Sequence, residues 1–204
     1  MDREISKLGV LLCLFLGGCA STIHVDLADS QIVNMSHEKL GISSSSSSSD
    51  KISRVIEFKI VTDKNLLEYY TFERNYPINI VCKAEGADRK ENLRSGGFGP
   101  FYKGVNLSKI LLPNDPNRKK IVSNDSKKYE YIVYSFIDLE AGYTQLHYGM
   151  PETSLKLERE KFVSVGCFIS GFAYPPFIPP RSNIFGVSKL EFEKMLIKYN
   201  ETNK

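Results

Sequence analysis

The feature that most limits the fold of this chain is an alternation of apolar and polar side chains with a period of two. In the stretch 51–61, KISRVIEFKIV, the apolar side chains of Ile56, Phe58 and Ile60 are separated by charged ones. Successive side chains of a strand point to opposite faces of its sheet, so this pattern predicts a strand with one buried face. Stretches rich in β-branched and aromatic residues predict further strands at 66–74, 77–83, 105–112, 129–139, 142–148 and 161–174.

Turn and loop residues separate these predicted strands. TDKN at 62–65 predicts a turn that joins the strands 51–61 and 66–74 into a hairpin. The segment 84–104 contains several glycines and Pro100, so we predict a loop there.

The last segment of the chain has a helical period instead. Ser188 and Glu191 match a capping box, in which both side chains satisfy free backbone amides at the start of a helix. Apolar side chains then recur at helical spacing at Phe192, Met195, Leu196 and Tyr199. We therefore predict a helix over 188–200 and a mainly β fold, an antiparallel β-sandwich with a C-terminal α-helix.

The N-terminus predicts export from the cytoplasm. A short polar start with Arg3 and Lys7 precedes the apolar run 8–16 and two glycines. This is the layout of a secretory signal peptide, which we assign to residues 1–18. The run is far shorter than the roughly 20 apolar residues that a membrane-spanning helix needs.

The stretch LGGC at 16–19 closes this run and resembles the lipobox of bacterial lipoproteins. The resemblance implies that diacylglycerol is joined to the sulfur of Cys19, that the bond before this residue is cleaved, and that the new amine is acylated, as with palmitate. Ala20 and Ser21 resemble the sorting pair of outer-membrane lipoproteins. We therefore expect a protein held by lipid in the outer membrane, on its periplasmic or its surface side.

We predict that residues 19–51 form a lipidated, serine-rich tether and that one domain follows over 52–204. The consecutive serines Ser43–Ser49 have no apolar surface to bury and cannot offset the entropy lost on ordering. TIHVDL at 22–27 alternates as an edge strand does, but the tether is the interpretation that we favour. A flexible linker of about 30 residues has a root-mean-square span of roughly 30 Å.

The chain has four cysteines, of which Cys13 lies in the predicted signal peptide and Cys19 is the predicted lipid site. Cys82 and Cys167 remain, and each lies on the apolar side of a predicted strand. Disulfides persist in oxidising compartments, so we predict a bond between these two residues. Two buried free thiols are the alternative.

Two stretches resemble strand pairs of transthyretin-like and carboxypeptidase-regulatory-like sandwiches, FIDLEAGYTQLHY at 136–148 and SLKLEREKFVSVGCFI at 154–169. In those sandwiches a strand ends at a glycine turn before an aromatic strand, as at Ala141-Gly142-Tyr143. A later pair has an aromatic–glycine ending, as in 162–166. The resemblance implies the same antiparallel sandwich.

No catalytic or metal-binding pattern is recognisable, so we predict no catalytic residue, no metal and no cofactor. No two of the histidines, His24, His37 and His147, have the spacing of zinc ligands. A formal net charge of +3 does not indicate a nucleic-acid partner. A cell-envelope hydrolase with a site assembled from scattered residues, such as His147 with a serine and a carboxylate, is the alternative function.

Two segments are candidates for binding. A basic cluster suited to the phosphates of envelope polymers consists of Arg118, Lys119, Lys120, Lys127 and Lys128. FAYPPFIPPR at 172–181 combines prolines, which fix an extended backbone, with the apolar side chains of Tyr174, Phe177 and Ile178. The alternatives are a solvated loop and a loop that covers the end of the sandwich. We expect a non-enzymatic binding or assembly-accessory module whose partners are the membrane and an envelope protein or anionic envelope polymer.

Overall fold

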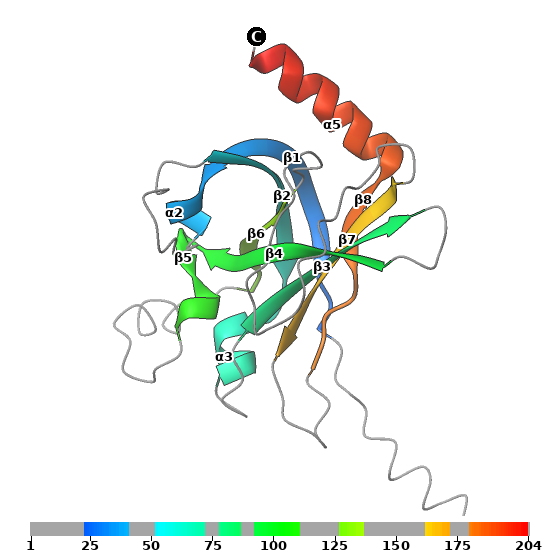
Figure 1. Ribbon diagram of the computed structural model, residues 1–204. Helices are drawn as coiled ribbons and strands as arrows, with labels where there is room; N and C mark the ends of the chain where they lie inside the picture. The colour runs from blue at the N-terminus through cyan, green and yellow to red at the C-terminus, as the bar shows by residue number, and fades with distance from the viewer. Residues whose placement is uncertain are drawn as a thin grey trace, which may run out of the picture.

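The computed structural model describes residues 23–40, 52–71, 78–86, 92–110, 127–136, 162–171 and 180–203. The strands are β1 (Asp26–Ser36), β2 (Ile52–Thr62), β3 (Ile78–Gly86), β4 (Asn92–Tyr102), β5 (Val105–Asn106), β6 (Tyr129–Phe136), β7 (Phe162–Gly171) and β8 (Phe185–Ser188). The helical segments are α2 (His37–Leu40), α3 (Leu66–Thr71), the 3-10 turn η1 (Leu107–Lys109) and α5 (Lys189–Thr202). The buried residues form one large hydrophobic cluster and one smaller cluster around Leu40, Val55 and Tyr134. α5 extends from one end of the body (Figure 1).

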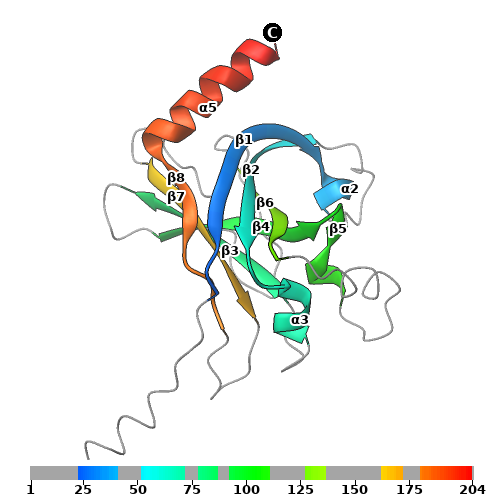
Figure 2. The ribbon, with the colours of Figure 1, turned by 180° about the vertical axis from the view of Figure 1, so that it is seen from behind.

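The strands form two antiparallel sheets, which confirms the predicted mainly β, sandwich-like fold with a C-terminal helix. The strand order is β1-β2-β6-β4-β3-β7-β8, and β5 pairs with β4. β4 belongs to both sheets, because its first half pairs with β3 and its second half, from Gly97 onward, pairs with β6. β1 and β8, the outermost strands of this order, lie side by side when the molecule is seen from behind (Figure 2).

The side chains that the alternation predicted to be buried line the interior. Ile56, Phe58 and Ile60 of β2 have no exposed surface, and they pack with buried residues of β3, β6 and β7. Cys82 and Cys167 lie directly opposite each other on β3 and β7 and form the predicted disulfide, which is fully buried. A disulfide typically contributes about 2–4 kcal/mol by restricting the unfolded chain.

The predicted loop over 84–104 is wrong for 92–102, which forms β4. Gly97 lies where this strand passes from one sheet to the other, and a Cβ there would collide with Ile80 and lie 2.9 Å from the sulfur of Cys82. Gly97 therefore permits two strands to cross closely. The prediction was wrong because it interpreted this glycine as a loop residue.

The predicted strand over 66–74 is wrong, because the segment begins with the helix α3. The side-chain oxygen of Asn65 accepts hydrogen bonds from the backbone amides of Leu67 and Glu68, as an N-cap does. Leu66, Leu67 and Tyr70 are buried, and this spacing is helical.

The strand predicted over 105–112 is confirmed only for β5, because η1 follows at once. The side chain of Asn106 caps this turn by accepting a hydrogen bond from the amide of Ser108. The strand predicted over 142–148 lies outside the described residues.

The predicted tether over 19–51 is wrong for residues 23–40. β1 pairs with β2 along its length, and Ile23, Val25 and Leu40 are buried. The apolar alternation thus buries a strand in the domain, which includes residues 23–40 and does not begin at residue 52. The serine run lies outside the described residues, between α2 and β2.

The C-terminal helix is confirmed with its cap. Ser188 accepts a hydrogen bond from the amide of Glu191, and the Glu191 carboxylate accepts one from the amide of Ser188. Phe192 is buried against the core. Met195, Leu196 and Tyr199 pack partly against it, so α5 binds the body through one face.

Candidate functional site

The described chain enters the domain at the end opposite the tip of α5 (Figure 1). We call this the entry end and define it by residues 23–26, 62–71, 127–129 and 180–184. Pairing places these segments together, because Ile23 bridges to Ser182 and Thr62 pairs with Tyr129.

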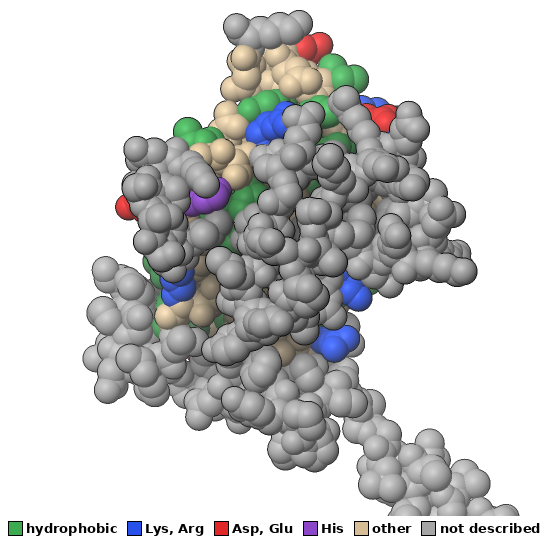
Figure 3. All heavy atoms as spheres, viewed as in Figure 1, with side chains coloured by type: hydrophobic (Ala, Val, Ile, Leu, Met, Phe, Trp, Pro, Cys, Tyr) green, Lys and Arg blue, Asp and Glu red, His purple; other side chains and the backbone are tan. Residues whose placement is uncertain are grey.

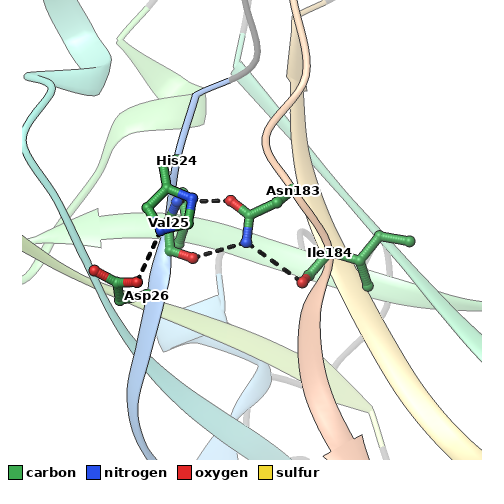
Figure 4. Close-up of polar contacts among 5 residues, drawn as sticks. All are labelled: His24, Val25, Asp26, Asn183 and Ile184. Atoms are coloured by element: carbon green, nitrogen blue, oxygen red, sulfur yellow. Dashed lines mark hydrogen bonds and ion pairs between the residues drawn. The ribbon is translucent and has the colours of Figure 1, made fainter.

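Asn183 holds the first residues of the domain in place (Figure 4). Its side-chain oxygen accepts a hydrogen bond of 2.6 Å from the amide of Val25, and its side-chain nitrogen donates one of 2.8 Å to the Val25 carbonyl. The backbone adds bonds from the amide of Ile23 to Arg181 and from the amide of Asn183 to Ile23. The side-chain amide of Asn183 therefore makes with the Val25 backbone the pair of hydrogen bonds that a neighbouring strand would make.

Two buried tyrosines, Tyr70 of α3 and Tyr131 of β6, connect α3 to the rest of the entry end. The hydroxyl of Tyr131 accepts a hydrogen bond from the amide of Leu66 and donates one to the carbonyl of Lys64. The hydroxyl of Tyr70 lies 3.4 Å from the carbonyl oxygens of both Ile169 and Pro180. The two side chains thus join α3 to β6, β7 and the 180–184 segment.

Burial raises the pKa of Tyr70 and of Tyr131 well above the ordinary value, because their phenolates would be poorly solvated. Burial also raises the pKa of Tyr134, and the charge of Glu57 adds to this effect. The three phenols are neutral hydrogen-bonding groups at neutral pH and are not poised for proton transfer.

The outer surface of the entry end combines apolar and charged side chains. Ile184 is 71% exposed, and the guanidinium of Arg181 lies 5.5 Å from the ring centre of Phe168 on β7. Nε2 of His24 lies 3.0 Å from a carboxylate oxygen of Asp26, and both side chains are exposed. The surface therefore offers an exposed aliphatic group beside a cation.

A second polar pair joins α2 to β2. Nε2 of His37 lies 2.9 Å from the hydroxyl of Ser53, and the ring of Phe136 contacts the imidazole edge-on. A serine next to a histidine is the first element of a nucleophilic site. Within the described ranges, no carboxylate is recorded within hydrogen-bond distance of this imidazole.

α5 carries the other exposed apolar side chains of interest. Leu190 and Ile197 are 61% and 59% exposed and lie two turns apart on the same helix face. This face points away from the Phe192 side that packs on the core.

The structure describes only part of the predicted binding segments. Lys127 and Lys128 are exposed and lie at the entry end, just before Tyr129. The 172–179 segment leaves from Gly171 and returns at Pro180, which are hydrogen-bonded to each other at this same end. The predicted site residues outside the described ranges are Cys19, Arg118, Lys119, Lys120, Tyr174, Phe177 and Ile178, together with His147.

Sequence reasoning missed Asn183 and Arg181 as residues that organise this end. The described Lys and Arg side chains on the face in Figure 3 are spread along the molecule and do not form one patch. Among the described residues there is no cluster of potential metal ligands, and no helix is both long and apolar enough to cross a bilayer.

The chain matches no protein-family model, no curated protein sequence and no solved structure.

Proposed function

We propose that this protein is an envelope lipoprotein, anchored through Cys19 in the outer membrane, that acts as a non-enzymatic binding or assembly-accessory module. The observation that carries the proposal is that Ile23, four residues after Cys19, is buried and bridges to Ser182. The lipobox-like stretch thus ends only four residues before a buried position of the domain.

Two further features support this function. The disulfide between Cys82 and Cys167 suits an oxidising compartment outside the cytoplasm. The exposed side chains of Leu190 and Ile197 on α5 give the domain apolar contacts for a partner. An envelope protein or an anionic envelope polymer is the partner class that we propose.

Replacement of the anchoring thiol tests the proposal. In Cys19→Ala cells we expect the protein to leave the membrane fraction and its intact mass to lack lipid, because no thiol remains to be alkylated. Ser21→Ala is the matched control and should stay lipidated. A Cys19→Ala protein that remains in the membrane with unchanged mass would contradict the anchor.

The hydrogen bond between His37 and Ser53 favours one second candidate, a serine hydrolase of the envelope. A fluorophosphonate probe separates the two functions. The binding module predicts equal labelling of wild type and Ser53→Ala, whereas labelling that Ser53→Ala abolishes would establish the hydrolase.

A further inference from the structure

The distance between the predicted lipid site and the folded domain is short. Only Ala20, Ser21 and Thr22 separate Cys19 from Ile23. Consecutive Cα atoms of an extended chain advance at most about 3.6 Å, so this span reaches about 14 Å at full extension. That is less than half of the roughly 30 Å expected for a 30-residue tether.

At the domain end of this span, the backbone of Ile23 and Val25 is fixed by hydrogen bonds. Ile23 is 2% exposed and bridges to Ser182, and the amide of Asn183 donates a hydrogen bond to its carbonyl. The two hydrogen bonds between Val25 and the Asn183 side chain fix the backbone two residues further on. Lengthening the span from this side would break all of these contacts.

The side chains beside this fixed point have the chemistry of a membrane interface. Ile184 follows Asn183 directly and is 71% exposed, more than the other described large hydrophobic residues. Arg181 precedes Asn183 by two residues, its guanidinium carbon lies 5.5 Å from the ring centre of Phe168, and its cation can bind lipid phosphate. Aliphatic and cationic side chains together suit the boundary between headgroups and acyl chains.

We propose that the entry end lies against the bilayer that holds the anchor, with Ile184 and Arg181 in contact with phospholipid and α5 directed away. This inference rests on the proposed lipid anchor and adds the orientation of the domain. The occupant of the surface is the phospholipid headgroup layer. α5 extends from the opposite end of the body (Figure 1), and Ile197 belongs to this helix, so it serves as the reference position away from that layer.

The two exposed isoleucines offer a matched test of this orientation. Ile184→Cys and Ile197→Cys are each produced as full chains, labelled with nitrobenzoxadiazole and reconstituted in vesicles of phosphatidylethanolamine and phosphatidylglycerol that contain doxyl-labelled lipid. Cys82 and Cys167 are joined in the disulfide. In the lipidated protein Cys13 is removed with residues 1–18 and the sulfur of Cys19 carries the lipid, so none of the four native cysteines reacts with the label. We expect strong quenching and a blue shift for the probe at 184, and the spectrum of a water-exposed probe at 197.

The outcomes separate the orientation from the anchor. Equal quenching at the two positions in vesicle-bound protein, or quenching at 197 alone, overturns the orientation and leaves the anchor intact. If neither labelled protein floats with the vesicles and both behave as Cys19→Ala does, the anchor itself fails. Flotation of both proteins with quenching at 184 alone supports the orientation.

Discussion

The two ends of the domain are held by different kinds of interaction. At the entry end, polar side chains join residues that are far apart in the sequence, such as Asn183 with Val25 and Tyr131 with Leu66. At the helix end, residues 188–203, the main polar contacts are local, such as the capping box of Ser188 and Glu191. The entry end therefore depends on the completed fold, whereas α5 has its own start signal.

This difference affects how each end responds to damage. Loss of one polar group at the entry end leaves buried backbone groups without partners, which is costly. When one polar group at the helix end is lost, its former partner is exposed to water, and a water molecule replaces the lost hydrogen bond. The predictions below compare the two ends, beginning with the largest expected effect.

Two asparagine substitutions provide the most direct comparison. Asn183→Ala should lower the free energy of unfolding by roughly 2 kcal/mol, because both the amide and the carbonyl of the buried Val25 lose a partner. Asn34→Ala removes only the exposed bond to the Tyr199 hydroxyl and should cost about 0.5 kcal/mol. Urea unfolding monitored by circular dichroism measures both, and equal losses would refute the distinction between the ends.

Alkaline pH should destabilise the entry end. Burial raises the pKa of Tyr70 and Tyr131 in the folded state, so the unfolded chain loses these protons first as the pH rises above about 10. Stability should be complete below that pH and then fall by up to about 1.4 kcal/mol per pH unit for each tyrosine. Tyr70→Phe should have a shallower slope between pH 10 and 11.5 than wild type. Parallel slopes would show that Tyr70 ionises equally in both states.

At the cap of α5 the expected effect is about half of that at Asn183. Ser188→Ala should destabilise the helix by about 1 kcal/mol, because the amide of Glu191 loses its acceptor. Ser188→Thr keeps the hydroxyl and serves as the control. In Ser188→Ala, hydrogen exchange should be faster than in wild type for the amides of α5 and unchanged for those of β2. The midpoint of urea unfolding should change little. Faster exchange at the entry end in this variant would mean that the two ends are coupled.

Much of the fold could be predicted from local patterns. β2, β3, β6 and β7 follow from the two-residue alternation, and the capping box marks the start of α5. The disulfide followed from the position of the cysteines on apolar faces together with the expected compartment.

The errors share one cause, which is that a local pattern has two meanings. The glycines of β4 suit a loop as well as a close crossing of strands, and the aromatic 66–74 segment suits a strand as well as a helix. The strand β1 was assigned to a tether because the neighbouring serine run outweighed a short alternation. In each case the tertiary partner, such as Ile80 beneath Gly97 or β2 beside β1, decided between the two.

The candidate site depended still more on the fold. Nothing near Asn183 in the sequence indicates a bond to Val25, because 158 positions separate the two residues. The exposure of Ile184 and its position beside the point where the chain enters likewise arise only after β7 and β8 have paired.

The sequence by itself determined the mainly β class, the pairing of Cys82 with Cys167 and the cap of α5. These features depend on alternation, on residue chemistry and on contacts within a few residues. Only the tertiary structure decided that residues 23–40 belong to the domain and which end of it closes around residues 23–26. Those properties depend on hydrogen bonds and burial between segments that chain order keeps apart, and such contacts exist only when the whole chain has folded.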